Sequence, residues 1–161
     1  MRKFKVYLDT SVISYLHQPD SPEKQAETLA LWERFRRGEY DVYLSQVTLD
    51  EMRKCGEEKL SALEEYMSQI DYTLLEDSVL ISETARIFID KGYLTQKSLN
   101  DCYHIAYAMC NGCDIILSWN FKHMVNVRIV DGVRIVSGVT GLSEVKIYSP
   151  EIITKGGEEN D

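Results

Sequence analysis

Alternating hydrophobic and polar positions predict the first strand of the chain. Phe4, Val6 and Leu8 alternate with Lys5 and Tyr7, so residues 4–8 should form a strand with one face inside. The same reading predicts further strands at residues 42–45 (VYLS), 72–75 (YTLL) and 114–117 (DIIL). Because the last of these is apolar from Ile115 to Leu117, it is typical of a central parallel strand.

Helical periodicity fills the segments between the strands. Ser21, Pro22 and Glu23 carry the signals that begin a helix, and Gly38 marks its end. Further helices are predicted at residues 48–68, at residues 77–92 with Asp77 or Ser78 as the cap, and at residues 98–112. The segment 128–139 fits a helix or strands, and we favour a helix.

Strands that alternate with helices indicate an α/β fold, with a parallel sheet covered by helices on both faces. The chain shows no internal repeat or linker, so we expect one domain over residues 1–154. Residues 155–161 end in the polar sequence GGEEND, which favours a disordered acidic tail.

Composition places the chain among ordinary globular proteins. Of its 161 residues, 44% are hydrophobic and 27% are charged, and no apolar run is long enough to span a membrane. Because no signal-peptide pattern is visible, we expect a cytoplasmic protein with no membrane partner. The four cysteines should be reduced, and the C-x-x-C pair at 110 and 113 closes a helix rather than opening one, which favours a structural role.

The net charge of −8 argues against a protein that holds nucleic acid by bulk electrostatics. The acidic tail and a site built from carboxylates would account for part of that charge. The acidity therefore lowers the odds of a nucleic-acid substrate without excluding one.

Three carboxylates should meet at the carboxyl edge of the sheet. Asp9 follows the first strand, while Glu51 and Asp101 lie early in helices that begin at that edge. Ser118 and Asn120 follow the strand at 114–117 and should lie there too. Clustered carboxylates repel one another unless a cation lies between them, and oxygen ligands select Mg²⁺ or Mn²⁺. Such a site suits hydrolysis of a phosphodiester.

Each of these residues also has a structural alternative. Asp9 could cap a short helix beginning at Thr10, and Glu51 could be a solvated helix residue. Asp101 fits a capping box with Ser98, and Asn120 alone would be a turn residue. Only their expected convergence favours the functional interpretation.

Neighbouring side chains could support the site. His104 lies three residues after Asp101 on the same helix, where we expect it to pack and form hydrogen bonds, with a role as catalytic base as the alternative. Trp119 and Phe121 could stack on bases or pack at the edge of the sheet, and Lys122 could meet a phosphate.

These residues together resemble the PIN domain family. The motifs LDTSVI and D-x-x-H-I-A, followed closely by an apolar strand and Ser-Trp-Asn, carry a resemblance that covers nearly the whole chain. It implies a three-layer α/β/α fold with a mostly parallel sheet, and a nuclease that cuts single-stranded RNA with Mg²⁺ or Mn²⁺. Many bacterial and archaeal members are VapC-type toxins that a cognate antitoxin holds inactive, so an antitoxin is an expected partner.

The resemblance also assigns residues. Asp9, Glu51 and Asp101 match the three acidic positions that bind metal, Ser11 matches a hydroxyl that supports the first acid, and Ser118 matches a hydroxyl that lines the site. Residue 120 departs from the family pattern, because Asn120 stands where many members have a fourth Asp. An amide carries no charge, so a second metal ion would bind less tightly.

The sequence therefore predicts a metal-dependent endoribonuclease in which Asp9, Glu51, Asp101 and Asn120 form the catalytic set. The alternative is a PIN-like module that binds RNA or protein without cutting it. The sequence leaves the oligomeric state open, with a homodimer as one alternative.

Overall fold

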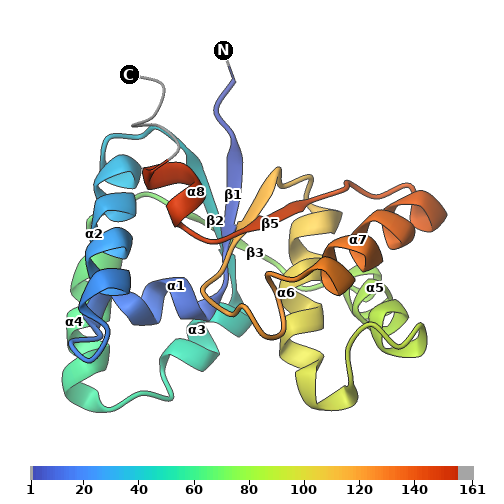
Figure 1. Cartoon of the computed structure of the whole chain (residues 1–161), viewed down its shortest axis with the longest axis horizontal. Coiled ribbons are helices and arrows are strands. Elements are labelled where there is room, and N and C mark those ends of the chain that lie inside the picture. The colour runs from blue at the N-terminus through green and yellow to red at the C-terminus, as the bar shows by residue number, and fades with distance from the viewer. Residues whose placement is uncertain (1, 156–161) are drawn as a thin grey trace.

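Five short parallel strands form one sheet in the computed structural model, which describes residues 2–155 (Figure 1). Their order is β3-β2-β1-β4-β5, so β1 lies at the centre. The strands are β1 (Lys5–Leu8), β2 (Asp41–Ser45), β3 (Thr73–Leu75), β4 (Ile115–Leu117) and β5 (Lys146–Tyr148). The first four agree with the predicted strands, whereas the three-residue β5 was not predicted.

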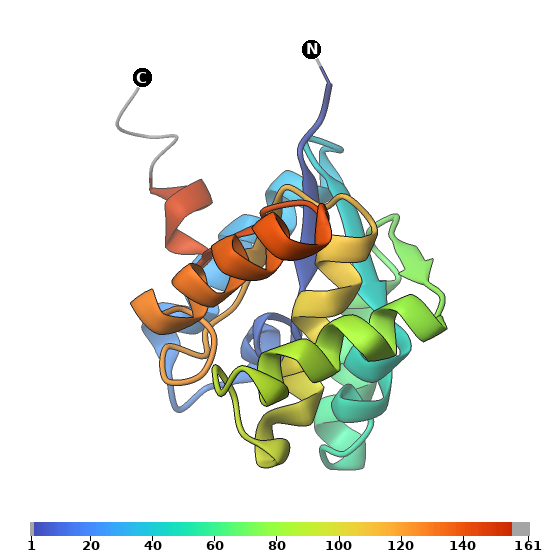
Figure 2. The same ribbon diagram turned by 90° about the vertical axis from the view of Figure 1, so that its right-hand side faces the viewer.

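Helices cover both faces of the sheet and make the three-layer fold that the sequence predicted. One layer holds α1 (Thr10–Ser14), α2 (Pro22–Arg36), α3 (Gln46–Met52), α4 (Glu57–Met67) and α8 (Glu151–Thr154), with the short 3₁₀ helix η1 (Tyr15–His17). The other holds α5 (Val79–Asp90), α6 (Leu99–Cys110) and α7 (Val127–Thr140). Figure 2 shows this second layer from its outer side. A 3₁₀ helix, η2 (Gln96–Ser98), leads into α6.

The prediction that the first strand has one buried face is wrong. Val6, Tyr7 and Leu8 are all fully buried, whereas Phe4, before the strand, is 54% exposed. Val6 and Leu8 pack toward α1 and α2, and Tyr7 packs toward α6. A central parallel strand is covered on both faces, so Tyr7 lies inside although its hydroxyl is polar.

Two helix predictions were confirmed and one needs correction. Ser78 caps α5 by accepting a hydrogen bond from the Ile81 amide at 3.3 Å, and the segment that also fitted strands is the helix α7. The single helix expected at 48–68 is instead two helices, because the chain turns after Met52 and α4 begins again after Gly56. The short α8 was not predicted.

The cysteine expectation holds, since all four are free thiols. Burial raises the pKa of the Cys113 thiol to about 12, which suits a structural residue. Within residues 2–155 no helix is long and apolar enough to cross a membrane. The predicted disordered tail covers residues 155–161, and residues 156–161 lie outside the part of the chain that the structure describes.

Candidate active site

The register of β1 against β4 brings Asp9 next to Ser118. Leu8 pairs with Leu117, and the Asp9 amide donates to the Leu117 carbonyl at 3.3 Å, so the residues that follow the two strands are neighbours. Ser118 Oγ donates to Asp9 Oδ2 at 2.5 Å. Oδ1 accepts from Ser11 Oγ at 2.5 Å and from the Ser11 amide at 3.0 Å. Two hydroxyls from distant parts of the chain therefore fix this carboxylate.

Asp9 also caps α1, as the structural alternative proposed. Its side chain is only 3% exposed, and burial raises its pKa above the ordinary value, against the charge of His104 and the hydrogen bonds from Ser11 and Ser118. The cap and the site are compatible, because a carboxylate offers about four lone pairs, and after these three hydrogen bonds one lone pair on Oδ2 stays free.

Glu51 reaches the same edge from α3 and is not a freely solvated side chain. Its Oε1 accepts from Thr10 Oγ1 at 2.8 Å and is 2.7 Å from His104 Nε2. Burial acts to raise the pKa of Glu51, but the hydrogen bonds from His104 and Thr10 outweigh it and hold that pKa below its ordinary value. Glu51 is therefore an ionised carboxylate in a fixed orientation.

His104 is 1% exposed and orients Glu51 rather than facing the solvent. Because the Glu51 carboxylate can only accept, the proton of the imidazole belongs on Nε2. In the neutral ring, Nδ1 then accepts from the Tyr7 hydroxyl, 2.6 Å away. The same hydroxyl lies 2.8 Å from Ser45 Oγ and 3.3 Å from Thr48 Oγ1.

Sequence reasoning missed this buried network, which connects β1, β2, α3 and α6. A Tyr in the middle of a strand that is covered on both faces was the available signal, since a buried hydroxyl needs partners. For His104, the prediction was packing and hydrogen bonds near the site, with a catalytic base as the alternative, and its ring nitrogens lie within hydrogen-bond distance of Tyr7 and Glu51.

Asp101 lies in the first turn of α6, and the capping-box alternative is not formed. Ser98 makes no side-chain cap bond, and within residues 2–155 the Asp101 carboxylate has no hydrogen-bond partner. Burial raises the pKa of Asp101, and the charges of Asp9 and Glu51 raise it further, whereas His104 and His123 act in the opposite direction. Asp101 is therefore close enough to Asp9 and to Glu51 for their charges to act on it.

The chemistry of this donor set fits a hard divalent cation, although the side chains as they stand do not form a complete binding site. Within residues 2–155 no three His, Cys, Asp or Glu side chains lie close enough together to hold a metal ion. The Ser118 hydroxyl fixes the orientation of the Asp9 carboxylate, and His104 fixes that of the Glu51 carboxylate. Their oxygens and those of Asp101 are the ligands that Mg²⁺ and Mn²⁺ prefer.

Asn120 is held as a turn residue, the alternative considered for it. The side-chain oxygen Oδ1 accepts a hydrogen bond from the backbone amide of His123 at 3.0 Å, and the backbone amide of Asn120 donates to Ser118 Oγ at 2.9 Å. The second bond ties it to the hydroxyl that holds Asp9. Its membership of the catalytic set stays a prediction.

Trp119 packs inside the protein, which favours the alternative to base stacking. It is 4% exposed, and its Nε1 donates to Thr28 Oγ1 at 2.9 Å. Lys24 Nζ lies 5.3–5.6 Å from the ring centroids of Tyr15, Trp119 and Phe121, within the range of cation–π attraction. Of these rings, Phe121 is 48% exposed and remains accessible.

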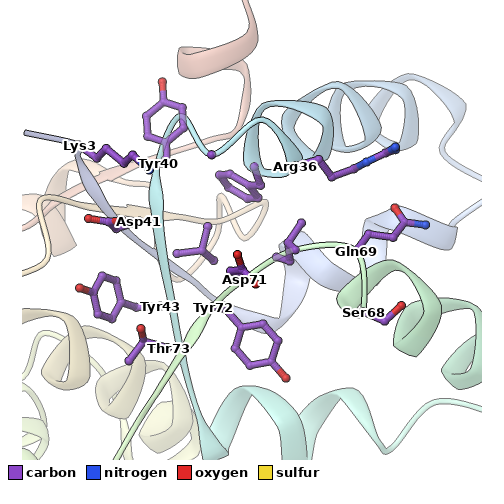
Figure 3. A pocket seen from close by; sticks show the side chains of 14 residues that line it. Lys3, Arg36, Tyr40, Asp41, Tyr43, Ser68, Gln69, Asp71, Tyr72 and Thr73 are labelled. Carbon is purple, nitrogen blue, oxygen red and sulfur yellow. The ribbon is translucent and has the colours of Figure 1, made fainter.

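A pocket of about 430 Å³ lies elsewhere, at the amino ends of the strands (Figure 3). Lys3, Asp41 and Thr73 line it, beside the starts of β1, β2 and β3. Since the acids follow the carboxyl ends of the strands, this pocket is not part of their site.

The fold and site define a three-layer α/β/α protein with an acidic site at the carboxyl edge of a parallel sheet. The chain belongs to the PIN domain family, whose model matches residues 6–122. A search of curated proteins found no match. Among solved structures, the fold is similar to a chain in the crystal structure of VapBC2 from Rickettsia felis bound to a DNA fragment from their promoter. That match has a TM-score of 0.55 and 12% identity, and it covers 89% of this chain and 97% of the other.

Proposed function

We propose that the chain is a metal-dependent endoribonuclease that cuts single-stranded RNA. The observation that carries this proposal is the convergence of Asp9, Glu51 and Asp101 from three separate segments on one edge of a PIN domain, where the charges of Asp9 and Glu51 act on Asp101. Like charges kept together at an edge are costly unless they serve to bind a cation.

Asp9, Glu51 and Asp101 are the residues that would hold Mg²⁺ or Mn²⁺. When bound, such an ion supplies positive charge to phosphate oxygens and acidifies a water molecule for attack on phosphorus. Ser11 and Ser118 keep Asp9 in place, and His104 keeps Glu51 in place, so two of the three acids are oriented in advance.

Cleavage of a labelled single-stranded RNA by the purified chain tests this proposal. We expect cleavage with Mn²⁺ or Mg²⁺ and none with EDTA, and Asp9→Asn and Asp101→Asn should both be inactive. Asp50→Asn is the matched control, because Asp50 lies next to Glu51 in sequence but is exposed. Equal activity in all variants would show that these acids do not form the site.

The non-cutting module is kept as a second candidate because the Asn120 oxygen already accepts a hydrogen bond in a turn and carries no charge. A folded wild-type chain that binds RNA and never cleaves it would favour this candidate.

We also propose that the chain acts as the toxin of a toxin–antitoxin pair. The support is family membership and the similarity to a chain of VapBC2. An acidic edge attracts basic groups, so the antitoxin should place Arg or Lys near Asp9 and Asp101. Expression of the chain should slow bacterial growth, and expression of Asp9→Asn should not. Equal inhibition by both would contradict the toxin role.

A further inference from the structure

A second pocket, of about 280 Å³, lies between the segment that follows α5 and the loop that leads into α7. Tyr93 and Ser98 line it on one side, and Lys122, His123 and Arg128 line it on the other. Figure 2 shows the end of α5 near the start of α7, where these segments approach each other. This volume is just below the range of about 300–1,000 Å³ typical of small-molecule sites, which suits a group of nucleotide size.

The pocket lies beside the acidic site. Ser98 comes immediately before α6, three residues ahead of Asp101. His123 is close enough to lower the pKa of Asp101, although burial and the neighbouring acids raise that pKa on balance. A ligand that occupies both places would therefore span neighbouring positions rather than two remote surfaces.

The charge of the pocket is opposite to that of the acidic site. Lys122 and Arg128 are positive, and among residues 2–155 no Asp or Glu lines the pocket. This is unusual for a chain with 26 acidic and 18 basic residues. Guanidinium and ammonium groups beside hydroxyls are the donors that bind phosphate oxygens.

Packing holds the walls of the pocket in place. Arg128 Nη2 donates to the Gly92 carbonyl and so joins α7 to the segment after α5. One such bond leaves most of the five guanidinium donors of Arg128 available to a ligand. The Tyr93 ring lies against Gly132, where an added Cβ would be 2.9 Å from Tyr93 Cγ. The His123 amide is fixed by Asn120 Oδ1 at 3.0 Å.

We propose that this pocket is a phosphate subsite that binds the RNA backbone one step along the strand from the scissile phosphate. The subsite rests on the proposed ribonuclease function and deepens it, because it says how an acidic protein retains an anionic strand. Lys122 and Arg128 bind the phosphate oxygens, and the Tyr93 ring forms the wall beside the attached nucleoside.

Binding of a fluorescein-labelled oligouridylate, measured by anisotropy in EDTA, tests the subsite without cleavage. Lys122→Ala with Arg128→Ala should weaken binding by about tenfold or more, and the slope of log affinity against log salt should fall by about 0.7 for each phosphate that the protein no longer neutralises. Arg134→Ala is the matched control, because Arg134 is on α7, is exposed and pairs with Asp131 at 3.7 Å outside the pocket. It should leave binding within about twofold of the wild type, since a surface charge acts weakly.

Two further variants separate binding from folding. Lys122→Ala alone removes a side chain that makes no hydrogen bond within residues 2–155, so it should weaken RNA binding at an unchanged melting temperature. Arg128→Lys keeps the charge and should bind better than Arg128→Ala. Wild-type affinity in the double variant, or failure of the wild type to bind the oligonucleotide, would overturn the subsite.

Inorganic phosphate distinguishes a strand-binding pocket from one for free phosphate. We expect the oligonucleotide to remain bound at equal concentrations of phosphate, and complete displacement would overturn the assignment to RNA. Parallel cleavage assays with Mn²⁺ separate the two proposals. Cleavage by the wild type with unchanged binding in the double variant would remove the subsite and leave the nuclease standing. Weakened binding in the double variant, together with a wild type that never cleaves, would remove the nuclease proposal and leave the phosphate subsite standing.

Discussion

Removing the single hydroxyl group of Tyr7 should destabilise the protein more than the loss of one oxygen atom suggests. In Tyr7→Phe the ring still fills its place, but Ser45 Oγ and His104 Nδ1 lose a partner at 2.8 and 2.6 Å. Thr48 keeps the Leu8 carbonyl at 3.3 Å. Ser45 is fully buried and His104 is 1% exposed, so water cannot readily replace the hydroxyl. Each buried polar group left without a partner costs about 1–3 kcal/mol. Because the variant no longer has to bury the Tyr7 hydroxyl itself, we expect a total loss near the lower end of the sum for two groups, about 2–3 kcal/mol.

Urea denaturation followed by tryptophan fluorescence measures this loss, and thermal melting should show a decrease of roughly 5–10 °C. Tyr107→Phe is the matched control, because Tyr107 is also buried but its hydroxyl has no hydrogen-bond partner within residues 2–155. That variant should change the free energy of unfolding by less than about 0.5 kcal/mol. Equal losses in the two variants would refute the view that the Tyr7 hydroxyl holds the network together.

Substitutions at four other positions test further parts of the structure. Asp9→Asn should abolish cleavage, yet it should stabilise the metal-free protein at neutral pH, because burial raises the pKa of Asp9 and so makes its ionised form costly in the fold. This gain in stability should shrink as the pH falls and the wild-type carboxyl takes up its proton. A variant less stable than the wild type at neutral pH would contradict this. Asn120→Ala should lower the free energy of unfolding by about 1 kcal/mol, because it removes the side-chain hydrogen bond in the turn. Asn120→Asp should keep that hydrogen bond and should bind Mn²⁺ more tightly, as measured by calorimetry. An unchanged Mn²⁺ affinity would exclude residue 120 from the metal site. Lys24→Met should cost about 1 kcal/mol in urea denaturation by removing the cation from three rings, and Lys24→Arg should cost less. The hydrogen bond from Arg2 holds the pKa of Asp114 below its ordinary value of 3.8, so the Arg2–Asp114 pair stabilises the fold above about pH 3.8 and less at lower pH. The difference in stability between the wild type and Asp114→Asn should therefore shrink when thermal melts are run in acid. A difference that stays constant with pH would contradict this role of the pair.

Much of the fold followed from local patterns in the sequence. Four of the five strands and most of the long helices were predicted, because apolar periodicity and capping residues such as Ser78 act within a few positions. The split between α3 and α4 and the three-residue β5 were missed. A turn inside an otherwise helical pattern and a strand of three residues carry too little periodic signal.

The sequence by itself determined which acids could meet, and only the tertiary structure decided what holds them. Asp9, Glu51 and Asp101 were assigned to one edge because each follows a strand or begins a helix there. Whether Trp119 would be open to a base depended on packing between distant segments, since its ring nitrogen meets Thr28, 91 residues away in the chain. The capping box between Ser98 and Asp101 was open in the sequence, and the structure shows that Ser98 forms no such bond. The Tyr7–His104–Glu51 network likewise joins residues from three elements. Buried polar groups are satisfied by whichever partners the packed sheet brings near, and no local pattern in the chain encodes those partners.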